Sequence, residues 1–380
     1  MIEAGASDLI VKSDGVPAAR VDGKLRFLAD TALSNEQVEA FGDSLLNDNE
    51  RRRFANDGEV DLSYQPEEIG RFRVNIFRRQ GKIGIVFRHI KQAIPSFEDL
   101  GLPAEKMERI SRLRRGLVLL TGVAGSGKST TIASILQYIN EHDYRHIITI
   151  EDPIEFQYCD KNSVFNQREV GSDTASFADA LKHCMRQSPD VILIGEMRDK
   201  VTMEAAITAA ETGHLVFSTL HTVNAVQSVE RIINFFPPEQ HNLIRLQLSL
   251  NLEAVVSQRL LRCKSGSGRI PSTEILFNTP LIGDLISEGK TRALPKALRD
   301  ESSHFGTQTF NQSLCELYAS GKIDLEEAKM ASGNPDDLEL EIRGIQKGGD
   351  MKRMPTDRYD KKEIERKQKG LVTGSDQFKV

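Results

Sequence analysis

The sequence predicts an α/β protein in which a parallel α/β domain follows a smaller α+β domain. Three observations support this fold class. The glycine-rich segment 122–129 stands between a buried-strand pattern and a helical one. Apolar runs and helical stretches alternate along the chain after it, which is typical of a parallel sheet. Residues 1–92 instead carry short strands of alternating polarity.

The first domain is expected to span residues 1–92. Ser34 has the side chain of a helix cap, and the apolar spacing after it predicts a helix to about Leu46. An Asp-Gly turn interrupts the second strand segment. The predicted strand segments of this domain are 9–12, 18–27, 70–77 and 82–88.

An interdomain linker is expected at 93–107, because Pro95, Gly101 and Pro103 interrupt regular structure there. The second domain is expected at 108–345. Leu and Val recur at helical spacings from Gln240 to Leu261, which predicts a helix. Buried strands are expected at 117–121, 146–150, 191–194 and 215–220, and helices at 130–140, 176–187 and 201–212.

The last segment, 346–380, holds 16 charged residues and eight large apolar or aromatic ones, and is expected to be a solvated, disordered tail.

Composition excludes several classes of function. The net charge of −5 gives no basic signature, so no nucleic-acid partner is expected. There is no apolar run of eighteen residues and no signal-like start. Four scattered cysteines predict neither a zinc site nor disulfides, so a cytosolic setting is expected.

The segment Gly122-Val-Ala-Gly-Ser-Gly-Lys-Ser129 fits the phosphate-loop pattern GxxxxGK[ST]. Its glycines let backbone N–H groups converge on an anion at a helix N-terminus. Lys128 would reach the β- and γ-phosphates of a nucleotide, and the Ser129 hydroxyl would bind Mg²⁺. A chance glycine-rich turn is the alternative, which the flanking strand and helix disfavour. The predicted nucleotide-binding residues of this segment are Gly122, Val123, Ala124, Gly125, Ser126, Gly127, Lys128, Ser129 and Thr130.

Two further strands end in acidic residues. Glu151, Asp152 and Glu155 follow the strand at 146–150, and ligands gather at such strand ends in open α/β sheets. Acids beside a triphosphate would repel it unless they hold Mg²⁺ or orient water. Asp152 alone could instead cap the next turn. Glu196 follows the strand 191–194 in a Walker B-like position and could hold a magnesium-bound water, although Gly195 replaces the usual Asp. The alternative is an acidic residue at an ordinary strand end.

Histidines flank the strand expected at 215–220. His214 and His221 stand at its two ends, too far apart along one strand to share a metal. A lone histidine there would usually be structural. The pair is interpreted as groups that sense phosphate or relay its loss.

Arginines cluster on the strands of the first domain. They form either a solvated sheet face or a cationic face offered to a phosphate or a neighbouring subunit. The residues are Arg71, Arg73, Arg78, Arg79 and Arg88.

Together these motifs resemble the secretion-ATPase superfamily. Their order is the phosphate loop, an Asp box (ITIEDPIEF), an atypical Walker B strand (ILIGEMRD) and a His box (TGHLVFSTLH). Within that superfamily the chain is similar to the type IV pilus retraction ATPases, the PilT/PilU family, over residues 1–342. Segments that match include 6–8, 70–74 and 166–170.

Several segments look more like the PilU branch than the PilT branch. Residues 280–286 read Pro-Leu-Ile-Gly-Asp-Leu-Ile where PilT has Ala-Ile-Arg-Asn-Leu-Ile. Segments 249–252, 278–281 and 308–310 are also PilU-like. The chain begins inside what is usually the family's first helix, so an alternative start is a further expectation.

The resemblance implies a PAS-like N-terminal domain followed by a RecA-like P-loop ATPase domain, assembled as a homohexamer with ATP between the domains. It implies that ATP and Mg²⁺ are the cofactors. By position, Glu155 matches the catalytic glutamate and Glu196 the Walker B glutamate. His214 and His221 match the His box, and Arg73 and Arg88 match arginines that face nucleotide.

The activity implied is ATP hydrolysis that powers pilus retraction and twitching motility. The implied partners are a platform protein of the inner membrane and a PilT-like paralogous ATPase, with the ring in the cytoplasm at that membrane. Two alternatives stay open. One is an accessory ATP-binding ring subunit that acts with a partner motor. The other is a pilus-extension or type II secretion ATPase, although the four-cysteine insert common in those proteins is missing from this sequence.

Overall fold

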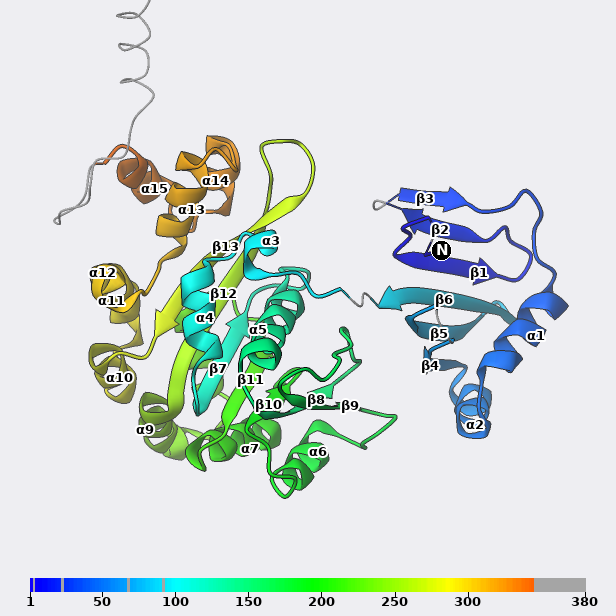
Figure 1. Cartoon of the computed structure of the whole chain (residues 1–380), viewed down its shortest axis with the longest axis horizontal. Coiled ribbons are helices and arrows are strands. Elements are labelled where there is room, and N and C mark those ends of the chain that lie inside the picture. Colours follow the sequence, from blue (N-terminus) through cyan, green and yellow to red (C-terminus); the bar gives the residue numbers. More distant parts are fainter. Residues whose placement is uncertain (3, 22–23, 67–68, 91–92, 345–380) are drawn as a thin grey trace, which may run out of the picture. The chain divides into compact units, whose positions relative to one another are not determined.

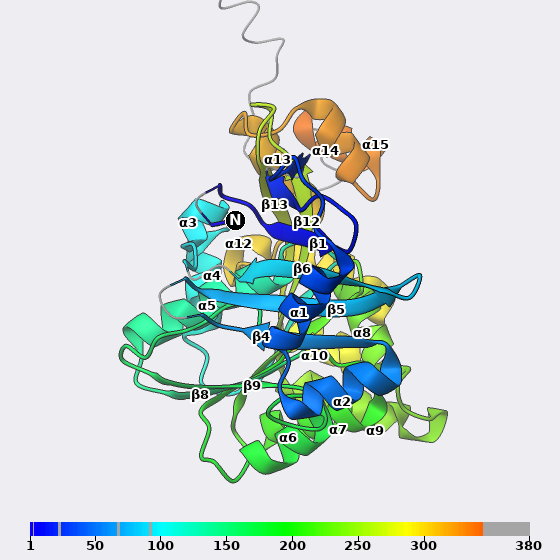
Figure 2. The same ribbon diagram turned by 90° about the vertical axis from the view of Figure 1, so that its right-hand side faces the viewer.

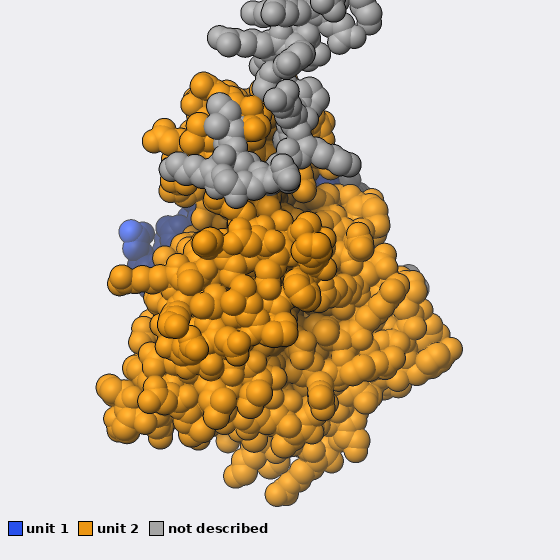
Figure 3. Space-filling view, turned by 90° about the vertical axis from the view of Figure 1, so that its left-hand side faces the viewer, with its two compact units in different colours: residues 1–94, 153–159 blue, residues 95–152, 160–380 orange. Residues whose placement is uncertain are grey.

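The computed structural model describes residues 1–344 apart from 3, 22–23, 67–68 and 91–92. The predicted tail at 346–380 therefore lies outside the described residues. The chain divides into two compact units, which Figure 3 colours separately. Unit 1 comprises residues 1–94 and 153–159, and unit 2 comprises residues 95–152 and 160–380. None of the helices in the described part of the chain is both long and apolar enough to span a bilayer.

Unit 1 is built on an antiparallel sheet in the order β3-β2-β1-β6-β5-β4. Its strands are β1 (Asp8–Lys12), β2 (Ala18–Val21), β3 (Lys24–Phe27), β4 (Glu59–Tyr64), β5 (Arg71–Arg79) and β6 (Lys82–Ile90). Two helices, α1 (Asn35–Leu45) and α2 (Asp48–Asp57), pack on one face of this sheet (Figure 2). Val38 of α1 and Phe54 of α2 join Val74, Ile76 and Ile85 of the strands in one core.

Local sequence accounts for most of unit 1. Ser34 caps α1 as predicted, because its hydroxyl accepts the N–H of Gln37. The predicted strand segments are confirmed, and the Asp-Gly turn lies outside the described residues. The sequence did not predict α2 and β4. Phe54 is the one buried residue of α2, so that helix leaves almost no apolar periodicity to detect.

Unit 2 is built on a seven-stranded sheet in the order β13-β12-β7-β11-β10-β8-β9. All neighbouring pairs are parallel except β12 with β13. The four predicted buried strands are confirmed as β7, β8, β10 and β11. The strands are β7 (Gly116–Thr121), β8 (His146–Glu151), β9 (Val164–Glu169), β10 (Val191–Ile194), β11 (Leu215–Leu220), β12 (Leu252–Arg262) and β13 (Arg269–Phe277).

Helices cover both faces of the unit 2 sheet (Figure 1). One group, α6 to α11, packs its apolar residues against the sheet in the largest core. The principal helices are α5 (Lys128–His142), α6 (Phe177–Cys184), α7 (Lys200–Glu211), α8 (Ala225–Ile233) and α9 (His241–Asn251). After the sheet come α10 (Pro280–Ser287), α11 (Leu294–Asp300), α12 (Ser302–Phe305), α13 (Phe310–Ala319), α14 (Leu325–Ala331) and α15 (Pro335–Ile342). Short 3-10 turns lie at η1 (Pro238–Gln240) and η2 (Thr291–Ala293).

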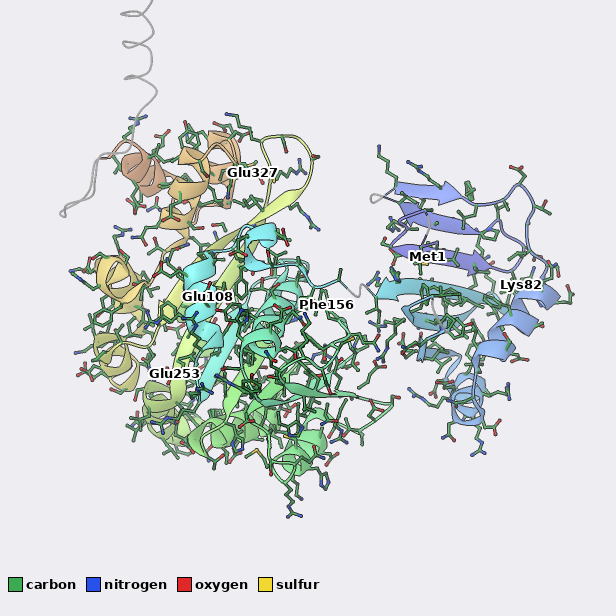
Figure 4. The ribbon with its side chains drawn as sticks, viewed as in Figure 1. Met1, Lys82, Glu108, Phe156, Glu253 and Glu327 are labelled. Carbon is green, nitrogen blue, oxygen red and sulfur yellow. The ribbon has the colours of Figure 1, made fainter. Side chains whose placement is uncertain are left out.

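The helix predicted from Gln240 to Leu261 is wrong in its second half. The helix α9 ends at Asn251, and β12 begins at Leu252 between β7 and β13. In β12 the residues 254–256 are fully buried, so their apolar run fits a two-sided strand as well as a helix. Figure 4 labels Glu253 near the start of β12 and Glu327 of α14. The Glu327 carboxylate accepts the N–H of Arg262, the last residue of β12.

The stretch 93–107, for which a linker was predicted, is not irregular throughout. It contains α3 (Phe97–Leu100) and the start of α4 (Ala104–Ser111), and from Pro95 it belongs to unit 2. Met107 and Ile110 of α4 are fully buried. The prolines and glycine that indicated a linker instead lie at the ends of these helices, where Gly101 closes α3 in a left-handed conformation.

Candidate nucleotide site

The phosphate loop joins the end of β7 to the start of α5. Gly122 has a φ of 146° and Gly127 a φ of 90°, conformations that side-chain-bearing residues rarely adopt. A Cβ at Gly122 would also lie 2.5 Å from the Gln258 carbonyl oxygen. Residues with a side chain would therefore be strained at both positions, which explains why the predicted motif has glycine there.

Lys128 begins α5 and lies buried, with 8% of its surface exposed. Its Nζ donates to the carbonyl oxygen of Gly122 at 2.7 Å and to that of Val123 at 3.2 Å. The ammonium therefore lies against the loop that the motif predicts to hold phosphates. Ser129 follows it in the first turn of α5.

A residue of β12 that the sequence interpretation did not single out supports the loop. Gln258 is 3% exposed, and its Nε2 donates to the Ser126 carbonyl oxygen at 2.8 Å. Its Oε1 accepts the hydroxyl of Thr131 in α5 at 2.8 Å. The one signal in the sequence is the polar stretch Ser257-Gln258-Arg259 between two apolar pairs. That signal was lost because the segment 240–261 was interpreted as a helix.

Glu196 lies just beyond the end of β10, on the same edge of the sheet as the phosphate loop, because β10, β11 and β7 are parallel neighbours. Its carboxylate accepts Arg198 Nη2 at 2.8 Å and lies 3.4 Å from His221 Nε2. Burial alone would raise the pKa of Glu196. The hydrogen bond and charge of Arg198, with those of His221, outweigh it and lower the pKa. Glu196 is therefore a carboxylate at neutral pH.

This cluster joins two predicted motifs, since His221 follows β11 and Glu196 follows β10. It also brings in Arg198, to which the sequence interpretation gave no role although it stands in the same motif. Gly195 precedes the cluster, where the usual Asp was expected. A Cβ at Gly195 would lie 3.2 Å from the Ile150 carbonyl oxygen, so β8 leaves little room there for a side chain.

The remaining acids of the Asp box in unit 2 lie at the end of β8. Glu151 is buried and accepts the Thr149 hydroxyl at 2.6 Å, whereas Asp152 is exposed. Glu151 also accepts Gln167 Nε2 of β9 at 3.3 Å, so its carboxylate is engaged within the sheet. The strand end itself lies at the same sheet edge as Glu196, because β8 and β10 are parallel.

His214 lies at the other end of β11 from His221. Its Nδ1 lies 3.1 Å from the Ala209 carbonyl oxygen and 3.2 Å from the Thr212 hydroxyl. The neighbouring residue Leu215 pairs with Gly116 at the start of β7, one strand length from the phosphate loop. Within unit 2 the two histidines therefore lie at opposite edges of the sheet, and only His221 lies at the edge of the loop.

The other predicted site residues belong to unit 1. Glu155 is exposed in the segment 153–159. Arg73 of β5 and Arg88 of β6 are cross-strand neighbours. Arg88 Nε lies 2.9 Å from Asp8 Oδ1, and Arg73 Nε lies 3.4 Å from an Asp61 carboxylate oxygen. Acidic partners thus offset the repulsion of two arginines placed side by side.

Comparison with known proteins identifies the chain's relatives. The family model described as "Type II/IV secretion system protein" matches residues 2–332. The type IV pilus ATPase PilU of Pseudomonas aeruginosa is 43% identical over 343 residues, which is 90% of this chain and 89% of that protein. The type IV pilus retraction ATPase PilT of the same organism is 43% identical over 334 residues, 88% of this chain and 96% of that protein.

A solved structure shares the fold along nearly the whole chain. It is a crystal structure of the pilus retraction motor PilT with bound ADP, 44% identical, with a TM-score of 0.83 over 89% of this chain and 96% of that one. The predicted fold class, a PAS-like domain followed by a RecA-like ATPase domain, is confirmed. The chain belongs to the type II/IV secretion system protein family, among the relatives of the pilus ATPases PilU and PilT.

Proposed function

We propose that this chain is an ATPase that powers the retraction of a type IV pilus. The observation that carries the proposal is the buried Lys128 in a phosphate loop, with the Glu196–His221 pair at the same sheet edge. The similarity to PilU and PilT at 43% identity along most of each chain supports the retraction role.

The residues divide the chemistry among them. Lys128 stabilises negative charge on the transferring phosphoryl group, and the loop N–H groups hold the phosphates. Glu155 orients or deprotonates the attacking water. Glu196 stays ionised beside Arg198 and His221. Through the direct contact between Glu196 and His221, the His box registers the state of the phosphates. Arg73 and Arg88 supply further cations, and His214 relays the change at the far end of β11.

The residues at this edge fit Mg²⁺. The Ser129 hydroxyl and the Glu196 carboxylate are hard oxygen ligands of the kind that Mg²⁺ takes. Ser126 Oγ is buried without a hydrogen-bond partner among the described residues, which is typical of a loop shaped around a polar ligand. When bound, Mg²⁺ neutralises charge on the β- and γ-phosphates. Ser129 would hold it directly and Glu196 through a water.

The assembly proposed is a homohexameric ring in the cytoplasm, peripheral to the inner membrane. It would act on the platform protein of the pilus machine, together with a PilT-like paralogue. Nucleotide-driven motion of its domains would supply the mechanical work.

Twitching motility and pilus retraction in a strain that lacks the gene test the proposal. Complementation with the wild-type chain restores retraction, and complementation with Lys128→Ala at equal protein level does not. Full retraction by the variant would contradict an ATP-driven role.

A second candidate is an accessory ring subunit that works only beside a partner motor. The observation that favours it is the sequence of α10, Pro280–Ser287, which departs from the PilT motif. Steady-state ATPase rates of the purified chain with and without a PilT-like ATPase distinguish the two. A chain that is inactive alone but raises the rate above that of the PilT-like ATPase alone supports the accessory role.

A further inference from the structure

Gln258 of β12 has a position that the phosphate-loop motif does not explain. The strand lies beside β7, and Ser257 pairs with Thr121, the last residue of β7 before the loop. Gln258 is thus the first residue of β12 beyond the end of its neighbour. Its side chain is buried, at 3% exposure, beneath the loop rather than in an apolar core.

Both ends of its amide are used. Nε2 donates to the Ser126 carbonyl oxygen, and Oε1 accepts the Thr131 hydroxyl, each at 2.8 Å. The first bond ends in the loop and the second in the first turn of α5. The Gln258 side chain therefore links the loop to α5. These two parts must keep their relative position if their N–H groups are to converge on an anion.

The glycines of the loop show how closely Gln258 fits. A Cβ on Gly127 would lie 2.8 Å from Gln258 Nε2, and one on Gly122 would lie 2.5 Å from the Gln258 carbonyl oxygen. The loop therefore rests directly on this residue at its first and last glycine. Rotation of the Ser126 peptide would break the hydrogen bond to Gln258.

We propose that Gln258 is a positioning residue for nucleotide binding, which holds the Ser126 carbonyl away from the phosphates so that the loop N–H groups face them. A carbonyl oxygen turned toward a triphosphate would repel it, whereas a carbonyl bound to the Gln258 amide cannot turn. The proposal rests on the function proposed above, since it requires that the loop binds nucleotide.

The test compares three substitutions in the full-length chain. Gln258→Leu keeps the approximate size of the side chain but leaves the Ser126 carbonyl and the Thr131 hydroxyl without their partner. The Kd and the KM for ATP should rise about tenfold, with a smaller change in kcat, because binding geometry rather than the chemical step is affected. Gln258→Glu should be worse still, since it places a carboxylate against that carbonyl and near the phosphates. Thr131→Val should have the smallest effect.

A matched control separates positioning from loss of stability. Gln308 is also 3% exposed in unit 2 and donates to the carbonyl oxygen of Thr273, the residue that pairs with Gln258 on β13, and β13 lies on the opposite side of β12 from β7 and its loop. Gln308→Leu should lower the Tm by a similar amount and leave the Kd for ATP within about twofold of wild type. The double variant of Gln258→Leu and Thr131→Val should lose less than the sum of the two single changes, because both remove the same bond.

The outcomes are distinct. If the wild-type chain binds no ATP, the proposed function fails. If the wild type binds ATP and Gln258→Leu lowers the Tm with a Kd like that of the Gln308 control, the positioning role is overturned. A selective rise of the Kd in Gln258→Leu supports it.

Discussion

The candidate site residues of unit 2 lie near the ends of buried parallel strands, whereas the two candidate arginines of unit 1 stand on strands of an antiparallel sheet. Lys128 is 8% exposed and is held by two loop carbonyls. The side chains of Arg73 and Arg88 are 40% and 68% exposed, and each pairs with an aspartate. A positive charge is thus held by backbone carbonyls in unit 2 and by ion pairs with aspartates in unit 1.

The two arrangements differ in the free-energy cost of burying the charge and in how easily the charged group can change its partner. A buried ammonium must be satisfied by fixed dipoles, so its place is set when the loop folds. An exposed arginine loses little when it exchanges an aspartate for a phosphate, because surface ion pairs contribute only modestly. Unit 2 therefore has the features of a fixed site, and unit 1 those of a surface whose cations can change partner.

Removal of the buried cation should have the largest effect. Lys128→Ala deletes the ammonium that lies over the loop and should lower ATP turnover at least about a hundredfold. Nucleotide affinity and steady-state phosphate release measure the loss. The control is Lys106→Ala, a partly buried lysine of α4 in the same unit. Near-normal turnover in Lys128→Ala would contradict the assignment of the nucleotide site.

Substitution of the glutamates tests one residue of each unit with the same change of charge. Glu155→Gln and Glu196→Gln keep the size of the side chain, and each should preserve ATP binding while turnover falls by about one hundredfold. Asp152→Asn, an exposed neighbour in the same box, is the control. A mutant that hydrolyses ATP at the wild-type rate removes that glutamate from the catalytic assignment.

The unit 1 arginines sharpen the comparison further. If they contact phosphates, Arg73→Ala or Arg88→Ala should lower turnover at least about tenfold while circular dichroism shows an intact fold. If they only form surface ion pairs, turnover stays at the wild-type value. Arg79→Ala, at the end of the same strand as Arg73, serves as the control.

The smallest expected effect concerns stability in unit 1. Burial would raise the pKa of Asp8, but hydrogen bonds from Ser7 and Arg88 and the charges of Arg88 and Arg20 lower it below the ordinary value. A carboxyl whose pKa is lower in the folded state contributes stability above its unfolded pKa. That contribution is lost as the pH falls through the folded value.

Asp8→Asn should therefore lower the free energy of unfolding by about 1 kcal/mol at pH 7. At a pH below the folded pKa of Asp8 the variant and the wild type should be equally stable. Urea unfolding of both proteins at the two pH values measures this, provided that the transition of unit 1 is followed. A difference that does not change with pH would indicate packing rather than charge.

The sequence alone determined what depends on short-range pattern. The glycines and Lys128 of the loop, the Ser34 cap of α1 and the buried strands β7, β8, β10 and β11 each follow from neighbours along the chain. The motif order also indicated the family, which the comparisons confirm. These features are readable because their physical requirements, a positive φ, a cap or an apolar run, are satisfied within a few residues.

The tertiary structure decided what depends on which strands become neighbours. An apolar run such as 254–256 suits a helix or a buried strand, and only its place between β7 and β13 makes it β12. Gln258 then meets Ser126 and Thr131 across more than 120 residues of sequence. The contact of His221 with Glu196, and the separation of His214 from it, likewise follow from the order β11-β10 and the direction of β11. Strand order is set by long-range packing, which no local pattern encodes.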